Sequence, residues 1–364
     1  MYRFFILVVV FFAANSNAQT IDTIFGPVEE NNQVILELLN SKAIQRLKYI
    51  DQSGPEPFFD ASFPSFNRYD HSLGVYALLK KYNVSTEEQI AGLMHDASHT
   101  VFSHLADLVF QSGIKRQESY QDSIHDWFLQ QMAVDKILAK YNLTIRDISP
   151  KNPSFIALEQ PFPDMNADRI EYNLHTGLVY KDLSHSDVTN ILNALQFNNN
   201  KWYFTDIYAA KKFAKLSTYY TKTFWGNAHN AAIYSVAAAA IKYALHKKLI
   251  VKDDLHFGAD QKIVDVLTTT SDPQLKIFVN MLRDINKYYV IADKNNYDIY
   301  QPVKMRGIDP LVLQAGNLRR LSSLSFDFKH ELELTQANCN HGIYIKFTRD
   351  LSSATIELLK NSNH

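Results

Sequence analysis

The sequence predicts a mainly α-helical fold with a small mixed α/β element near the C-terminus. Through most of the 364 residues, apolar side chains recur three and four positions apart, which is the spacing of one helix face. Strand-like runs are short and few, at residues 201–204, 288–291 and 342–347. The composition, 46% hydrophobic and 21% charged, is typical of a globular chain with a substantial core.

The helices are expected in a regular succession along the chain. Apolar residues follow helical spacing over residues 32–49, whereas glycine and prolines mark residues 51–64 as a loop. Helical spacing returns at 71–82, and the run Ser85-Thr86-Glu87-Glu88 is typical of a helix start that leads into His95. Further helices are expected at 122–141, 164–176, 187–195, 206–222, 230–247, 260–268 and 273–285.

The first eighteen residues have the pattern of a secretory signal peptide. Arg3 precedes an apolar run from Phe4 to Phe12, and small residues follow up to Ala18. We expect cleavage after Ala18 and a mature chain that is secreted or periplasmic; the alternative is a buried N-terminal strand. No second apolar run of spanning length follows, so no membrane span is expected after cleavage.

The remaining chain shows no linker-like stretch and no change of composition. We therefore expect one large helical domain over residues 19–250. Residues 251–364 are expected to form a C-terminal extension packed on it.

Charge and cysteine content exclude several classes of protein. The formal net charge is −1 and no basic stripe is evident, so nucleic-acid binding is not indicated. The single cysteine, Cys339, excludes an intrachain disulfide and a cysteine-based zinc site. With 13 histidines in the chain, a metal site is expected to use histidine and carboxylate ligands.

One stretch, residues 91–104, concentrates groups that can bind a metal. It contains the adjacent pair His95-Asp96, while His71 lies upstream and Asp168 downstream. If the pair lies on a helix, its side chains are about 100° apart, so the other ligands must come from other helices. Two imidazoles and two carboxylates suit Fe, Mn, Ni, Zn or Mg. A His-Asp dipeptide taken alone usually has no function, and only the combination indicates a divalent metal site.

Several longer motifs occur in order around these residues. They are Gln45-Arg46-Leu47-Lys48-Tyr49-Ile50-Asp51-Gln52-Ser53-Gly54, Phe63-Pro64, Arg68-Tyr69-Asp70-His71-Ser72-Leu73-Gly74-Val75, His95-Asp96 with Phe102-Ser103-His104, Asp272-Pro273-Gln274-Leu275 and Arg306-Gly307-Ile308-Asp309-Pro310. With them the chain resembles the HD-domain phosphohydrolases, and among these the deoxynucleoside-triphosphate triphosphohydrolases of the SAM-and-HD-domain type. The resemblance covers roughly residues 24–315 and implies an HD-domain helical bundle.

The resemblance also implies roles for individual residues. The metal ligands would be His71, His95, Asp96 and Asp168. The residues lining the catalytic pocket would be His99, His104, Asp107 and His125, with His125 and Asp107 as a couple that assists proton transfer to the leaving oxygen. The phosphate contacts would be Arg68, Arg169, Tyr172 and Lys212, with Tyr220 stacking on the sugar and Gln52 bound to a sugar hydroxyl. For Lys212, Tyr220 and Gln52, an ordinary surface or core position is the alternative.

The chain departs from the family pattern at two places. Ala97-Ser98-His99-Thr100-Val101 replaces a stretch that usually has glycines and a proline, and Phe66 stands where another histidine is frequent. Both changes lie near the expected phosphate site.

The resemblance implies conversion of a dNTP and water to deoxynucleoside and triphosphate by a metal-dependent hydrolase. The first alternative is a phosphomonoesterase or phosphodiesterase acting on nucleoside monophosphates, cyclic nucleotides or another phosphoester. The second is a non-catalytic nucleotide-binding protein. The partner is accordingly a nucleotide or another phosphorylated small molecule. The family also implies a homo-oligomer, a dimer or a tetramer.

Overall fold

The computed structural model describes residues 18–110, 119–348 and 351–361. The predicted signal peptide, apart from Ala18, lies outside the described residues. Helices make up most of the described chain, and the strands form small sheets, which confirms the predicted mainly α fold with a small mixed element. In the described part of the chain, no helix is long and apolar enough to cross a membrane.

An antiparallel hairpin begins the described chain and packs on a central helix. Its strands are β1 (Gln19–Thr23) and β2 (Gly26–Glu30), and Ile21 is buried against α3 (Arg68–Lys81). The turn requires a positive φ, which Gly26 supplies at +105°. The chain then continues through α1 (Gln33–Leu39), α2 (Lys42–Arg46) and the 3₁₀ turns η1 (Leu47–Tyr49) and η2 (Glu56–Phe58).

Three helices meet at the centre of the N-terminal half. Helix α3 packs against α4 (Thr86–Met94) on one side and α8 (Ala167–Val179) on the other. Each begins at a capping side chain that accepts a backbone N–H: Asn67, Ser85 and Asn166. Around them lie α5 (Leu105–Phe110), α6 (Tyr120–Gln131), α7 (Val134–Ala139), η3 (Ile145–Ile148) and α9 (His185–Ala194).

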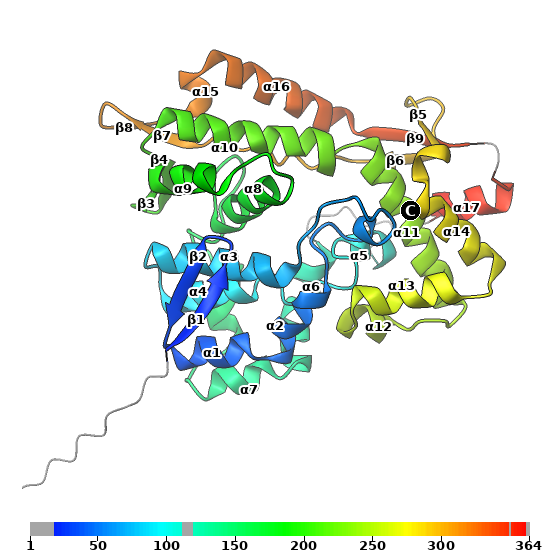
Figure 1. Ribbon diagram of the computed structural model, residues 1–364, viewed down its shortest axis with the longest axis horizontal. Coiled ribbons are helices and arrows are strands. Elements are labelled where there is room, and N and C mark those ends of the chain that lie inside the picture. Colours follow the sequence, from blue (N-terminus) through cyan, green and yellow to red (C-terminus); the bar gives the residue numbers. More distant parts are fainter. Residues whose placement is uncertain (1–17, 111–118, 349–350, 362–364) are drawn as a thin grey trace, which may run out of the picture.

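A second group of helices follows in the sequence, and its first member, α10 (Ile207–Tyr220), packs on α8. Helix α10 runs into a π-helical turn, η4 (Thr221–Trp225), and lies beside α16 (Phe326–His341), as Figure 1 shows at the top of the view. The alanine-rich helix α11 (Ala228–His246) is buried against α5, α14 and β9. The remaining helical segments are α12 (Lys252–Phe257), α13 (Asp260–Thr269), α14 (Pro273–Arg283), η5 (Ile285–Lys287), α15 (Leu321–Leu324) and α17 (Ser353–Asn361).

Two further sheets join segments that are distant in sequence. One has the order β3 (Leu195–Asn198), β4 (Lys201–Phe204), β7 (Leu311–Gln314) and β8 (Asn317–Arg320). The other has β9 (Ile343–Phe347) between β5 (Tyr289–Ile291) and β6 (Ile299–Gln301). The β4–β7 pair is parallel and the other pairs are antiparallel, so the first sheet is mixed. Through the β4–β7 pair, this sheet also joins the predicted domain of residues 19–250 to the predicted extension of residues 251–364.

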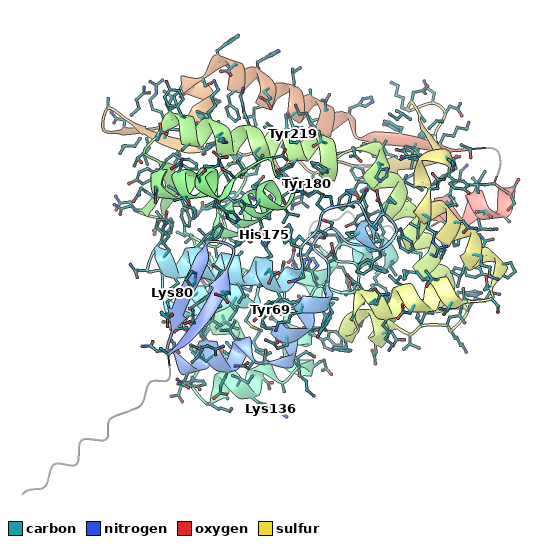
Figure 2. The ribbon with its side chains drawn as sticks, in the orientation of Figure 1. Tyr69, Lys80, Lys136, His175, Tyr180 and Tyr219 are labelled. Carbon is teal, nitrogen blue, oxygen red and sulfur yellow. The ribbon has the colours of Figure 1, made fainter. Side chains whose placement is uncertain are left out.

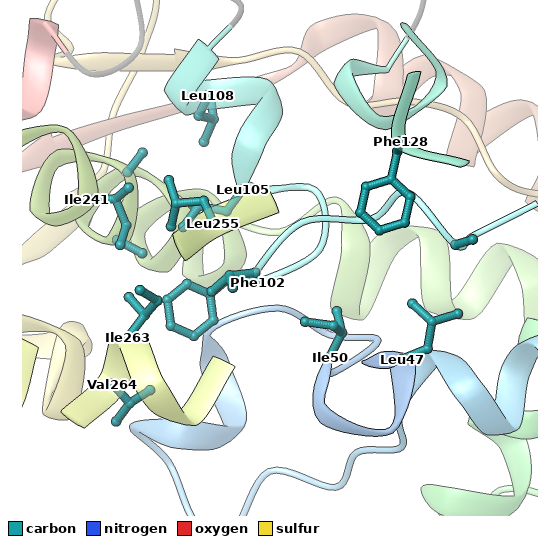
Figure 3. Close-up of a cluster of buried hydrophobic side chains, with 14 of the residues drawn as sticks. Leu47, Ile50, Phe102, Leu105, Leu108, Phe128, Ile241, Leu255, Ile263 and Val264 are labelled. Carbon is teal, nitrogen blue, oxygen red and sulfur yellow. The ribbon is translucent and has the colours of Figure 1, made fainter. Parts of the chain in front are cut away.

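The turn after α4 is anchored in the larger hydrophobic core. Phe102 is buried among Leu105, Leu255 and Ile263 (Figure 3). Its backbone N–H donates to Oδ1 of Asp260 at 2.8 Å. Replacing a buried phenylalanine by alanine typically costs about 3–5 kcal/mol, so this contact holds the residues just before it firmly in place.

Candidate metal centre

Three of the predicted ligands converge on one point. Donor atoms of His71, His95 and Asp168 all lie within 4.8 Å of one another. The Nε2 atoms of the two histidines are 3.2 Å apart, and Oδ1 of Asp168 lies 3.1 Å from Nε2 of His71. The residues come from α3, from the C-terminus of α4 and from α8. Both histidines are buried, whereas the Asp168 side chain is 28% exposed.

The fourth predicted ligand, Asp96, lies at the edge of this cluster. Its Oδ2 is 3.5 Å from Nε2 of His71, and its Oδ1 is 3.4 Å from Nε2 of His95. Oδ2 also accepts a hydrogen bond from Nη1 of Arg68 at 2.5 Å. The expectation that His95 and Asp96 share a helix is wrong, because α4 ends at Met94 and Asp96 lies in the following turn.

The second nitrogen of each histidine has an acceptor that fixes the tautomer. Nδ1 of His71 donates to Glu171, and Nδ1 of His95 donates to the carbonyl oxygen of Gly92 at 2.7 Å. Each Nε2 is therefore unprotonated in the neutral ring and faces the cluster. Sequence reasoning missed Glu171, although it lies three positions after Asp168 on the same helix face.

The charges around the cluster favour a cation there. Burial alone lowers the pKa of His71, but the carboxylates of Glu171, Asp168 and Asp96 together reverse this effect and raise it to about 10. Burial opposes ionisation of Asp168, yet the two imidazoles hold its pKa well below the usual range. His71 and His95 thus offer nitrogen donors, and Asp96 and Asp168 offer negatively charged oxygen donors. Such a set fits a divalent metal ion of the Fe, Mn, Ni, Zn or Mg group.

A cavity of about 640 Å³ opens beside the cluster. That volume falls in the usual range for small-molecule sites. The predicted site residues that line it are Gln52, Arg68, His95, Asp96, His99, His104, His125, Asp168, Arg169 and Tyr172.

The His-Asp couple near the cavity differs from the predicted one. Asp107 lies 3.4 Å from Nδ1 of His104, whereas Nδ1 of His125 is 2.9 Å from the hydroxyl of Ser98. Among the described residues, the histidine beside Asp107 is therefore His104 and not His125. The reason is local, because His104 and Asp107 are three positions apart across the start of α5, whereas His125 comes from α6.

Two buried histidines of the cavity, His99 and His125, have pKa values that burial holds below the usual range. Burial lowers the pKa of His125 to about 4 and that of His99 to about 3. Nε2 of His125 and Nδ1 of His99 have no hydrogen-bond partner among the described residues. Both atoms are themselves buried.

Two predicted substrate contacts do not line the cavity. The ammonium of Lys212 lies 2.6 Å from Asp187, and Tyr220 is fully buried with its hydroxyl donating to Asp182 at 2.8 Å. Both belong to α10, which packs on α8, α9 and α16. The structure thus separates these two side chains from the metal cluster.

The structure adds two cations that the sequence analysis did not assign to the site. Lys304 and Arg306 belong to the segment between β6 and β7 and line the same cavity. Arg306 begins the motif Arg306-Gly307-Ile308-Asp309-Pro310, but nothing in the sequence indicates that it lines the same cavity as Asp168.

The chain is similar to proteins of several organisms. It is 31% identical over 331 residues, 90% of this chain and 98% of the relative, to YdhJ, an uncharacterized protein of Bacillus subtilis. It is 24% identical over 301 residues to the metal-dependent phosphohydrolase cns2 of Cordyceps militaris, covering 81% of this chain and 85% of cns2. A stretch of 103 residues, 24% of this chain and 16% of the relative, is 36% identical to human deoxynucleoside triphosphate triphosphohydrolase SAMHD1.

A solved structure shares the fold. The phosphohydrolase BT4208 of Bacteroides thetaiotaomicron superposes with a TM-score of 0.65 at 14% identity, covering 91% of this chain and all of that chain. No protein-family profile matches the chain. Since the similarity to YdhJ covers nearly the full length of each protein, the chain belongs to the YdhJ family, within the HD-domain phosphohydrolase superfamily.

Proposed function

We propose that this protein hydrolyses deoxynucleoside triphosphates to deoxynucleoside and triphosphate in a metal-dependent reaction. The observation that carries the proposal is the cluster of His71, His95 and Asp168, with both Nε2 atoms turned inward, beside a cavity that also holds Arg68 and Arg169. The similarity of a short stretch to SAMHD1 supports the choice of substrate.

Different side chains of the cavity can serve different steps of phosphoester hydrolysis. A divalent metal held by His71, His95, Asp96 and Asp168 would polarise a phosphoryl oxygen and increase the acidity of water. Arg169 donates to the carbonyl oxygen of Asp164 at 2.6 Å, which holds its guanidinium at the cavity wall for a phosphate. The oxygen of water joins the α-phosphorus, and the bond from that phosphorus to the 5′-oxygen of the sugar breaks.

The leaving 5′-oxygen needs a proton, and His104 is the best-placed donor. Its side chain is 40% exposed on the cavity, and the Asp107 carboxylate faces its Nδ1. A carboxylate in this position holds the imidazole in a fixed orientation. His125 is less suited, since its pKa of about 4 leaves it without a proton to donate near neutral pH.

A smaller phosphoester is the second candidate substrate. The observation that favours it is the position of Lys212 and Tyr220, which lie outside the cavity and so cannot supply the phosphate and sugar contacts that the resemblance implies. A nucleoside monophosphate, a cyclic nucleotide or another phosphoester would not need them.

Product analysis distinguishes these reactions. The purified chain, loaded with Mn²⁺ or Mg²⁺, is incubated with dNTPs, NTPs, nucleoside monophosphates and cyclic nucleotides, and the products are separated by chromatography. Free deoxynucleoside with intact triphosphate supports the proposal. Orthophosphate from monophosphates, or no turnover of any nucleotide by metal-loaded protein, contradicts it.

We also propose that the chain is exported, on the basis of the charged, apolar and small-residue pattern of residues 1–18. The test is N-terminal sequencing of the protein made with its own first residues in a secreting host. A mature N-terminus at Gln19 supports export, and an intact Met1 in the cytosol contradicts it.

A further inference from the structure

We propose that Lys304 and Arg306 form a phosphate-binding arm that makes this site prefer substrates with a chain of phosphates over monophosphates. The arm is the segment of residues 302–310 between β6 and β7. The inference rests on the proposed function, because it assigns the phosphates that do not contact the metal to these two side chains.

The first argument is position. Lys304 and Arg306 line the cavity that also contains His95, Asp168 and Arg169. They come from a part of the chain more than a hundred residues after those groups, so their presence there requires the whole molecule to be folded. An extended substrate that starts at the metal can reach both parts of the wall.

The second argument is that the arm is fastened directly after Arg306. The backbone N–H of Ile308 donates to the hydroxyl of Ser217 at 2.9 Å, and that of Asp309 donates to the carbonyl oxygen of Pro163 at 3.2 Å. Gly307 lies close to neighbouring side chains, since a Cβ there would lie 2.7 Å from Cε of Met305 and 3.0 Å from Cγ2 of Thr218. The two cations are therefore held on a fixed support, which is what ligand binding requires.

The third argument concerns the orientation of Arg306. Its guanidinium carbon lies 6.0 Å from the ring centre of Tyr172 and 5.6 Å from that of Trp225. Trp225 ends the π-helical turn η4, a kind of distortion that is frequent at functional sites. The two rings thus hold the guanidinium by cation–π attraction, and a guanidinium carries several N–H groups that can bind an anion.

The fourth argument is unbalanced charge. In the described part of the chain, no carboxylate oxygen lies within 4.0 Å of the cationic groups of Lys304, Arg306 or Arg169. The guanidinium of Arg306 lowers the pKa of Lys304, which means that the two cations repel each other. The acidic groups that act on Lys304 from nearby are Asp168, a metal ligand, and Asp122. A bound polyanion would relieve the repulsion between the two cations. A purely structural role would explain why Arg306 lies against two aromatic rings, but it would not explain the exposed Lys304.

The test compares Lys304→Ala and Arg306→Lys with two control variants, Lys329→Ala and Arg319→Ala, which remove exposed cations outside the cavity. Arg306→Lys keeps the charge and avoids the loss of packing that alanine would cause. Binding of inorganic triphosphate and of orthophosphate to the Mn²⁺-loaded protein is measured by calorimetry. The values of kcat and KM for a dNTP and its monophosphate are measured alongside.

We expect Lys304→Ala and Arg306→Lys to weaken triphosphate binding by about tenfold or more, as loss of a charge-assisted hydrogen bond predicts. Orthophosphate binding, Mn²⁺ affinity and both control variants should change less than about twofold. Equal weakening for triphosphate and orthophosphate, or unchanged triphosphate binding, would overturn the inference. Because binding of inorganic triphosphate needs no turnover, the inference can survive a wild-type protein that does not hydrolyse dNTPs.

Discussion

The Glu171 carboxylate accepts hydrogen bonds from Nδ1 of His71 on one oxygen and from Nδ1 of His175 on the other. It is completely buried between α8 and α3, and Figure 2 shows His175 at this junction. Gly74 of α3 makes room for it, since a Cβ at that position would lie 2.4 Å from Oε1. The orientation of the ligand His71 thus depends on a contact between two helices.

Replacing Asp168 by alanine should remove metal binding without unfolding the protein. Asp168 is a partly exposed member of the cluster, and the buried His71 beside it keeps Glu171 and Asp96 as acidic neighbours when Asp168 is removed. Metal content after dialysis and turnover should both fall to background. Asp126→Ala is the control, because Asp126 lines the same cavity outside the cluster. Full metal content in Asp168→Ala would contradict the assigned centre.

Replacing Glu171 by glutamine should weaken metal binding while retaining the shape of the side chain. An amide can still accept from His71 but no longer supplies negative charge, and such supporting changes typically cost about 10–100-fold in metal affinity. Titration with Mn²⁺ measures the effect. Glu30→Gln, which alters another buried carboxylate on the hairpin, should bind Mn²⁺ like the wild type. Equal affinities in all three proteins would count against a positioning role.

Replacing Gly74 by alanine should lower metal affinity instead of stabilising α3. Alanine in a helix is normally better than glycine by about 1 kcal/mol, but here the new methyl meets Glu171. The decisive comparison is a double-mutant cycle on the free energy of unfolding and on Mn²⁺ affinity. In a Glu171→Ala background the methyl has space, so Gly74→Ala should then be harmless. Additive effects would show that the two residues are not coupled.

Replacing His104 by glutamine should reduce kcat by about 10²–10⁴-fold, because the proposed proton donor is lost. KM and Mn²⁺ affinity should stay close to wild type, as His104 is not among the clustered ligands. His125→Gln should retain more of kcat than His104→Gln does. A larger loss of kcat in His125→Gln than in His104→Gln would indicate that His125 is the proton donor instead.

Stability should fall between pH 6.5 and 4, in part because of His125. Burial lowers its pKa from 6.5 to about 4, so in this window the unfolded chain binds a proton that the folded chain does not. Between pH 6.5 and 4, the free energy of unfolding should therefore fall by about 3 kcal/mol less in metal-free His125→Asn than in the metal-free wild type.

Chemical denaturation at each pH, with a chelator present, measures this difference. His246→Asn, which removes an exposed histidine, should follow the wild type. His71 and His95, whose pKa values are raised, titrate in every one of these proteins and cancel in the comparison. Parallel curves for His125→Asn and wild type would contradict the assignment.

The sequence by itself determined the helical class and most helix positions. Helical spacing depends on neighbours three and four residues away, which is why α3, α8, α11 and α14 appear close to where the pattern predicts them. It also indicated the metal-binding residues, because histidine and aspartate in this order within apolar segments form a rare combination. Their distances in the structure are consistent with that assignment.

Strands that depend on distant partners were harder to predict. The hairpin of β1 and β2 is short and is supported by packing on α3, and the hairpin of β7 and β8 is joined to the distant strand β4. Helix α16 was also missed.

Only the tertiary structure decided which groups meet at the cavity. It placed His104 beside Asp107 and buried Glu171 against His71. It also brought Lys304 and Arg306 into the cavity that Arg169 lines, and left Lys212 and Tyr220 out of that lining. Such contacts depend on how helices pack and on the directions in which side chains leave them. Local periodicity does not contain that information, because residues far apart in the chain meet through the energy of the whole packed core and not through their spacing.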